Sequence, residues 1–144
     1  MFPQKISLSK TDPVKVVVRY PDGRILKGYT QNFASHRAIF HIRPDKTKVL
    51  NQAQEVTVKD LKSVFFVRDF AGDPNYKEKK TFSCGMNRIG KKIEVGFRDG
   101  EVLVGLNLGY DPRQPGFFIY FGDPNSNLIS AFVVSAATEW VREI

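Results

Sequence analysis

The sequence predicts an all-β protein that contains two similar small β-barrels packed together. Three observations lead to this prediction. Apolar and polar residues alternate in several short runs, which is the period of a strand rather than of a helix. An Asp-Gly pair stands between two apolar runs in each half of the chain, and the two pairs are 77 residues apart. The stretch Val14–Phe33 is repeated at Lys91–Tyr110, with six identical positions.

The composition is that of a folded protein. Of 144 residues, 42% are hydrophobic and 26% are charged, which distinguishes the chain from a disordered one. No apolar run approaches the ~20 residues that span a bilayer, and the start of the chain has no apolar core of a signal peptide. Cys84 is the single cysteine, so no intrachain disulfide can form. We expect a cytoplasmic protein without a membrane partner.

Each half is expected to open with a β-hairpin. Apolar residues share one face of its first strand: Val14, Val16, Val18 and Tyr20 in the first half, and Ile93, Val95 and Phe97 in the second. Asp22–Gly23 and Asp99–Gly100 then predict type I′ turns, which need positive φ at both central residues. Gly28 and Gly105 fall within the second strand, where the absence of a Cβ allows a sharp bend. We assign these residues to folding, although two matching aspartates suggest a catalytic pair.

Three further strands are expected in each half. Ala38–Ile42 aligns with Gly116–Tyr120 as the third strand, and a polar loop follows in both halves. Glu55–Val67 aligns with Ala131–Arg142 at an offset of 76, after a slip of one residue. Both segments predict a strand, a tight turn and a last strand. Each half therefore contains five short strands.

The expected domain organisation is an N-terminal arm (1–13), a first barrel (14–67), a linker (68–90) and a second barrel (91–144). Halves of 54 residues bury too little surface to be stable alone. Phe65 and Phe66 make the end of the first barrel apolar on both faces. We therefore expect the second barrel to cover that segment, so that the two barrels form one cooperative unit.

Two motifs resemble a known strand pattern. The stretches "DGRILKGYTQNFA" (22–34) and "DGEVLVGLNLGYD" (99–111) resemble the D-G-R-x-x-x-G-x-L-x-x-[aromatic]-D pattern of Sm-like proteins. This resemblance implies two tandem five-stranded SH3-like (Sm-like) barrels from an internal duplication. The Met-Asn and Ile-Arg-Gly signatures that bind RNA in that family are absent, so the resemblance does not imply RNA binding.

The segment between the barrels resembles a second pattern. "VRDFAGDPNY" (67–76) is similar to the V-R-D-F-x-G-x-P-x-Y stretch of bacterial proteins in which it joins two such halves. This resemblance implies a bacterial family, and it implies no activity, cofactor or substrate.

The sequence contains no recognisable catalytic, metal or cofactor site. His36 and His41 lie five residues apart and on opposite faces of a predicted strand, which argues against a shared metal. Cys84 has basic neighbours that favour a reactive thiolate, but no histidine lies near it in the sequence. No phosphate-binding glycine loop is present. We expect no enzyme activity.

The charge distribution suggests a binding surface. Residues 1–80 carry 16 Lys and Arg and 8 Asp and Glu, whereas residues 81–144 carry 6 and 7. The candidate binding residues are Lys46, Lys48, Lys59, Lys62, Arg68, Asp69, Tyr76, Lys77, Lys79 and Lys80. Arg68 and Asp69 interrupt an apolar run, so they either pair with the other half or line a groove. Other functional positions are expected where the halves differ, as at Arg24, which aligns with Glu101.

Two functions fit these features. The first is a non-enzymatic bacterial binding or adaptor module that holds a protein partner in the groove between the barrels or at an open sheet edge. The alternative is nucleic-acid (RNA) binding through the basic first barrel, with an affinity that falls steeply as salt rises.

Overall fold

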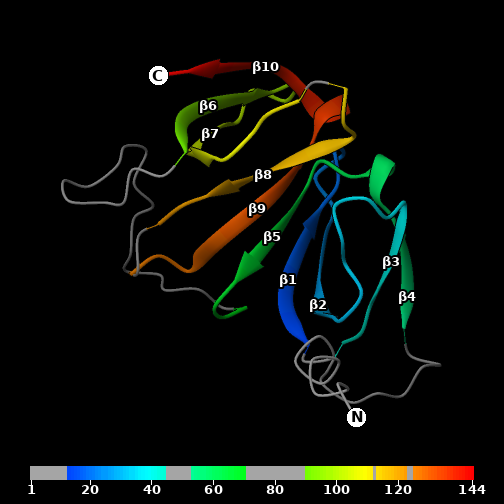
Figure 1. Ribbon diagram of the computed structural model, residues 1–144. Coiled ribbons are helices and arrows are strands. Elements are labelled where there is room, and N and C mark those ends of the chain that lie inside the picture. Colours follow the sequence, from blue (N-terminus) through cyan, green and yellow to red (C-terminus); the bar gives the residue numbers. More distant parts are fainter. Residues whose placement is uncertain (1–12, 45–52, 71–89, 112, 123–124) are drawn as a thin grey trace, which may run out of the picture.

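The computed structural model describes residues 13–44, 53–70, 90–111, 113–122 and 125–144 as an all-β fold (Figure 1). The strands are β1 (Val14–Arg19), β2 (Ile25–Thr30), β3 (Ile39–Ile42), β4 (Gln54–Thr57), β5 (Ser63–Val67), β6 (Lys91–Phe97), β7 (Val102–Asn107), β8 (Gly116–Tyr120), β9 (Leu128–Val134) and β10 (Thr138–Glu143). Two short 3-10 turns, η2 (Val58–Asp60) and η3 (Ser135–Ala137), precede β5 and β10. None of the helical turns in these ranges has the length or the apolar character that crossing a membrane requires.

The strands form one large antiparallel sheet and one small one. The large sheet has the order β10-β6-β7-β8-β9-β5-β1-β2, and the small sheet pairs β3 with β4. A bridge between Tyr29 and Arg43 connects β2 to the end of β3. Each half therefore orders its strands as fifth, first, second, third and fourth. The all-β prediction is confirmed, but neither half closes into a barrel within the described ranges.

The two halves are joined by the pairing of β5 with β9, which we call the seam. The strands β5 and β9 lie side by side (Figure 1). In their register Val64 lies opposite Phe132, and Phe65 lies opposite Ala131. Successive side chains of the seam enter different cores. Phe132 packs with the first half's core residues, whereas Phe65 packs with those of the second half. The expectation that Phe65 and its neighbours are covered by the second half is confirmed.

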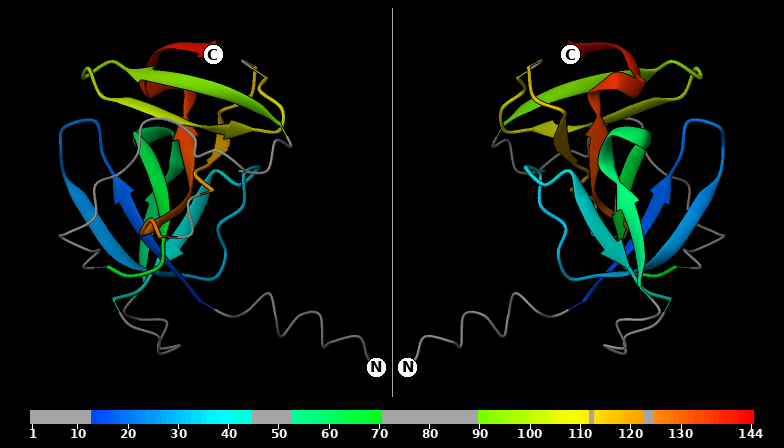
Figure 2. Two further views of the ribbon diagram at one scale, coloured as in Figure 1. Left: turned by 90° about the vertical axis from the view of Figure 1, so that its left-hand side faces the viewer. Right: turned by 90° about the vertical axis from the view of Figure 1, so that its right-hand side faces the viewer.

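One core lies on each side of the seam. Figure 2 shows β6 and β10 at one end of the molecule and β1 and β2 toward the other. Each core is thus closed partly by a strand of the other half. Since a buried aromatic or aliphatic side chain contributes roughly 1.5–3 kcal/mol, the exchanged side chains are a large part of what holds the halves together.

Both Asp-Gly hairpins form, but their turns are not of type I′. Gly23 and Gly100 have φ values of 96°, and no other residue type has positive φ in the described chain. The amide of Gly23 donates to the carbonyl of Tyr20 at 3.1 Å, and the amide of Tyr20 donates to the carbonyl of Arg24 at 3.0 Å. This is a three-residue loop in which only the glycine is left-handed. The prediction of two positive-φ residues per turn is wrong, because the loop is one residue longer than assumed.

The offset between the halves stays at 77 throughout, so the predicted slip to 76 in the last strands is wrong. Phe40 lies opposite Val56 and Phe117 lies opposite Val133, so the alignment of Ala38–Ile42 with Gly116–Tyr120 is also wrong by one residue. The turns η2 and η3 begin at Val58 and Ser135, which are 77 residues apart. Val64 lies opposite Val18 in the first half, and Val141 lies opposite Val95 in the second. The error has a physical cause. Seam strands are apolar on both faces, so alternation no longer defines which side chains face inward.

Gly28 and Gly105 lie within β2 and β7, as predicted. A Cβ on Gly28 would lie 2.4 Å from the carbonyl oxygen of Arg43, so the glycine is required by the close approach of the two backbones. At Gly105 the nearest atoms, in Ile119 and Tyr120, would lie 3.1 Å away. The requirement for glycine is therefore stronger in the first half.

Candidate functional site

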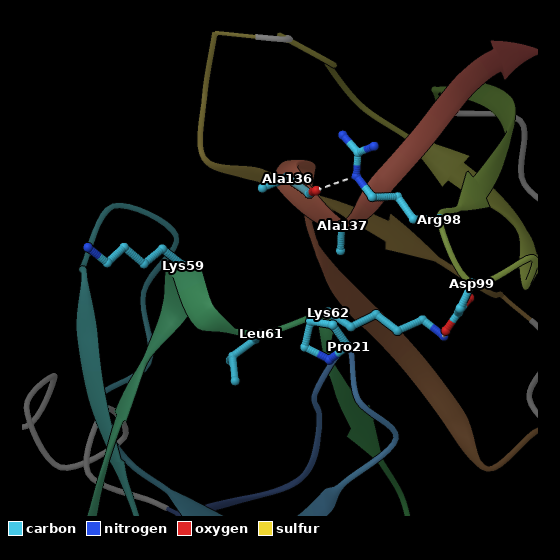
Figure 3. A pocket seen from close by; sticks show the side chains of 8 residues that line it. All are labelled: Pro21, Lys59, Leu61, Lys62, Arg98, Asp99, Ala136 and Ala137. Atoms are coloured by element: carbon cyan, nitrogen blue, oxygen red, sulfur yellow. Dashed lines mark hydrogen bonds and ion pairs between the residues drawn. The ribbon is translucent and has the colours of Figure 1, made fainter.

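A pocket of about 410 Å³ lies beside the seam, at the end of the molecule where η2 and η3 lie (Figure 3). We call it the seam pocket. Its lining comes from four chain segments of both halves: Pro21, Lys59, Leu61, Lys62, Arg98, Asp99, Ala136 and Ala137. The two hairpin turns and the two 3-10 turns thus place every lining residue. The volume is within the range of sites that hold small ligands or single side chains.

Backbone hydrogen bonds fix the floor of the seam pocket. The amide of Leu61 donates to the carbonyl of Val58 at 3.0 Å and closes η2. The amide of Lys62 donates to the carbonyl of Arg19 at 2.8 Å, and the amide of Val134 donates to the carbonyl of Lys62 at 3.1 Å. These bonds tie the chain at Lys62 to both halves, so the floor is rigid and apolar at Leu61.

Lys62 is buried, and its ammonium group forms an ion cluster across the seam. The Lys62 side chain is 4% exposed, and its Nζ lies 2.6 Å from Asp99 Oδ2 and 2.5 Å from Glu101 Oε1. Arg19 Nη2 lies 2.8 Å from the same oxygen of Glu101. The prediction that Lys62 belongs to an exposed basic surface is wrong. A buried ammonium needs paired acids, and the second half supplies them.

The electrostatics of the cluster keep both acids ionised. The hydrogen bond from Lys62 lowers the pKa of Asp99 below its ordinary value. Burial raises the pKa of Glu101, but hydrogen bonds from Arg19 and Lys62 outweigh this effect and lower it. Two cations thus face two anions at neutral pH. The cluster is charge-balanced, and it serves to join the halves rather than to attract a ligand.

The exposed cations of the seam pocket are Lys59 and Arg98, while the exposed carboxylate of Asp99 is paired with Lys62. Arg98 donates from Nε to the carbonyl of Ala136 at 2.9 Å. Within the described ranges neither Lys59 nor Arg98 forms an ion pair. Figure 3 shows them on opposite sides of the pocket, with the ammonium and the guanidinium directed outward. The pocket therefore combines an apolar floor with a cation at each side of its mouth.

Arg68 and Asp69 lie elsewhere along the seam. Arg68 donates from Nη1 to the carbonyl of Ser126 at 2.7 Å, and the amide of Asp69 donates to Asn127 Oδ1 at 2.7 Å. Both contacts reach the second half, which fits the interpretation that these residues tie the two halves together.

His41, one of the two histidines of the chain, contacts Asn32 through Nδ1 at 3.0 Å.

The remaining candidate residues lie outside the described part of the chain. They are Lys46, Lys48, Tyr76, Lys77, Lys79 and Lys80, together with Cys84. Of the four candidate binding residues that the structure describes, Lys59 and Lys62 line one pocket.

The sequence pointed to the position where Arg24 aligns with Glu101, but neither Arg98 nor Glu101 was among the candidate binding residues. The available signal was the difference between the halves. In the first half, Asp22 and Arg24 form an ion pair of 2.8 Å within their own turn. In the second half, Glu101 has the position of Arg24 and forms an ion pair with Lys62. Glu101 could have been selected as a partner for a basic residue of the first half. Arg98 precedes Asp99 directly and occupies the position of Pro21, so the same comparison identifies it.

Comparison with known proteins gives one match. A family of unknown function (DUF6982) matches residues 12–144 of the chain. No curated protein and no solved structure matches it.

Proposed function

The chain belongs to the family of unknown function DUF6982, and we propose that it is a non-enzymatic module that binds a protein partner in the seam pocket. The observation that supports this proposal is the arrangement of Lys59 and Arg98 on opposite sides of an apolar floor. A matching partner is an extended segment with one apolar side chain between acidic residues. The apolar side chain enters the pocket, and the carboxylates reach the two cations.

The expected energetics give this binding a recognisable signature. Burial of a leucine-sized side chain contributes roughly 1.5–3 kcal/mol, whereas an exposed ion pair contributes about 0–1 kcal/mol. Affinity should therefore depend more on the apolar side chain than on the charges. Salt should weaken the binding only modestly, since two exposed contacts are screened.

Nucleic-acid binding through the basic first half is the second candidate. The excess of Lys and Arg in residues 1–80 favours it. Among the described residues that line the seam pocket there is no aromatic side chain on which a base stacks, so phosphate contacts alone support this candidate there. Such binding depends steeply on salt.

Short synthetic peptides test the proposal. Peptides with a central leucine between glutamates should bind, as measured by fluorescence anisotropy, and a serine in place of the leucine should weaken binding about tenfold. Arg98→Glu should weaken binding, because it places a carboxylate beside the acidic residues of the peptide. Arg37→Glu removes an exposed cation away from the pocket and is the matched control.

Two results would contradict the proposal. The first is equal binding of the leucine and serine peptides. The second is an absorbance ratio at 260 and 280 nm that reveals co-purified nucleic acid at low salt, together with an affinity that falls steeply as salt rises.

We also propose that the two halves arose by duplication of one five-stranded SH3-like (Sm-like) unit. The common strand order, the matching hairpin turns and the offset of 77 residues between equivalent strand pairings support this proposal. The single cysteine and the linker pattern support a cytoplasmic, bacterial setting, which fractionation of cells that produce the protein would test.

A further inference from the structure

The strand β10 offers a sheet edge whose counterpart in the first half is occupied. Within the described residues β10 pairs only with β6 and ends the large sheet. The strand β5 has the same place in the first half, because it pairs with the first strand β1. On its other edge β5 carries β9. The two edges therefore have equivalent positions, and one of them holds an added strand.

The added strand brings an aromatic side chain into the core of the first half. Phe132 of β9 lies opposite Val64 and is fully buried. Its ring lies 5.3 Å from the ring of Phe33, and the same cluster contains Val16 and Phe66. Phe132 thus fills the space between the first strand, the last strand and the loop after β2.

The second half has a hollow in the equivalent place. The counterparts of Val16, Phe33, Val64 and Phe66, at an offset of 77, are Ile93, Tyr110, Val141 and Glu143. All four line a hollow of about 720 Å³.

The walls of the two sites match at the aromatic residue after the second strand, whereas the place of Phe66 is taken by Glu143. The ring of Tyr110 lies 4.7 Å from Phe117, as Phe33 lies 5.0 Å from Phe40. Leu108 and Tyr110, which border the hollow, are 64% and 40% exposed. Exposed apolar side chains around a hollow are typical of an interaction site.

We propose that β10 accepts an extended antiparallel strand of another protein, and that an aromatic side chain of this strand fills the hollow. The geometry of the seam defines the register. The aromatic residue lies opposite Val141, the preceding residue lies opposite Arg142, and the following residue lies opposite Trp140. An acidic residue before the aromatic one can share the guanidinium of Arg142, which already contacts Glu94 at 2.6 Å. An apolar residue suits the position opposite Trp140. The partner is thus an edge strand with the order acidic, aromatic, apolar.

A second copy of this chain does not fit the hollow. In the described chain a second copy offers two open edges, that of β10 and that of β4, which is paired only with β3. A second β10 in antiparallel pairing turns Val141 and Glu143 to the face of the hollow, so it brings no aromatic side chain there. In the register of the seam, Glu55 takes the place of Phe132. A carboxylate leaves the apolar walls at Ile93, Tyr110 and Val141 uncovered, and it adds a second acid to a hollow that Glu143 already lines. Charges that point inward at sheet edges also disfavour strand addition between copies. The occupant is therefore a different protein.

A peptide copied from the seam tests this proposal. The probe is the segment 127–134, which carries Phe132, with a lysine tail for solubility. It should bind the full chain and shift the backbone amide resonances of β10. The same peptide with Phe132→Ala should bind about tenfold more weakly, because it leaves the hollow unfilled. A peptide with Ala131→Lys should also bind more weakly, because it opposes Arg142.

Protein variants separate this site from the seam pocket. Leu108→Glu changes an exposed side chain at the hollow and should abolish peptide binding without loss of folding. Lys59→Glu lies in the seam pocket and should leave this binding unchanged. Absence of binding, equal affinity for the Phe132→Ala peptide, or resonance shifts in β5 instead of β10 would overturn the proposal. Association of the chain with itself that Leu108→Glu removes would overturn the choice of partner.

Discussion

Replacement of Lys62 by methionine tests the ion cluster at the seam. Lys62→Met keeps a side chain of similar shape in a site that is 4% exposed, and it removes the charge that faces Asp99 and Glu101. One charge-assisted hydrogen bond contributes roughly 1.5–3 kcal/mol, and loss of one partner of a fully buried ion pair costs roughly 3–5 kcal/mol. The two carboxylates are not fully buried, since Asp99 is 44% and Glu101 31% exposed.

The partial exposure of the acids reduces the expected loss. Water can solvate Asp99 in the variant, and Glu101 keeps Arg19 at 2.8 Å. We expect the free energy of unfolding to fall by about 2 kcal/mol, below the fully buried limit. Urea unfolding measures this as a lower midpoint at an unchanged slope. The exposed neighbour Lys59→Met is the matched control and should change stability by less than about 0.5 kcal/mol. Equal midpoints for the two variants would refute the reasoning.

Three further predictions follow from the same contacts. Folding lowers the pKa values of Asp99 and Glu101 from their ordinary values of 3.8 and 4.5. The two carboxylates therefore stabilise the fold fully above these values, and this contribution is lost as the pH falls through the lower folded values. The urea midpoint should decline below pH 4.5, and a flat profile would contradict the assignment. Glu55→Phe should make the chain associate head to tail, because β4 then offers an aromatic residue to the hollow beside β10. The average mass measured by sedimentation should rise with protein concentration. A monomer at all concentrations would count against the register. Gly28→Ala should destabilise the fold by about 2 kcal/mol and Gly105→Ala by less than about 1 kcal/mol, as thermal or urea unfolding would show; the reverse order would be inconsistent with the close contact at the first site.

The sequence was informative where structure depends on local chemistry. Alternating residues predicted the strands, and the Asp-Gly pairs predicted both hairpins. The apolar faces of Phe65 and Phe66 correctly predicted that the second half covers the end of the first. These signals are strong because each depends on a few neighbouring residues.

The sequence failed where the result depends on strands far apart in the chain. The seam strands are buried on both faces, so their alternation did not reveal that the offset of 77 continues to Val141. The burial of Lys62 depends on acids 37 and 39 residues away, which only the fold brings close. The hollow beside β10 was also hidden, because it is recognised by comparison with the filled place of Phe132.

The exchange of side chains at the seam has a consequence for the order in which the chain is made. When residues 14–67 have emerged from the ribosome, every strand of the first half is free to pair, yet Phe132 and Val134 of its core have not emerged. At that stage the residues of the second half that pack against Phe65 have not emerged either. The first half therefore remains incomplete until β9 emerges, and folding of the whole chain is coupled to the end of its synthesis. Until then the nascent chain presents an apolar sheet edge, which chaperones recognise and which invites aggregation.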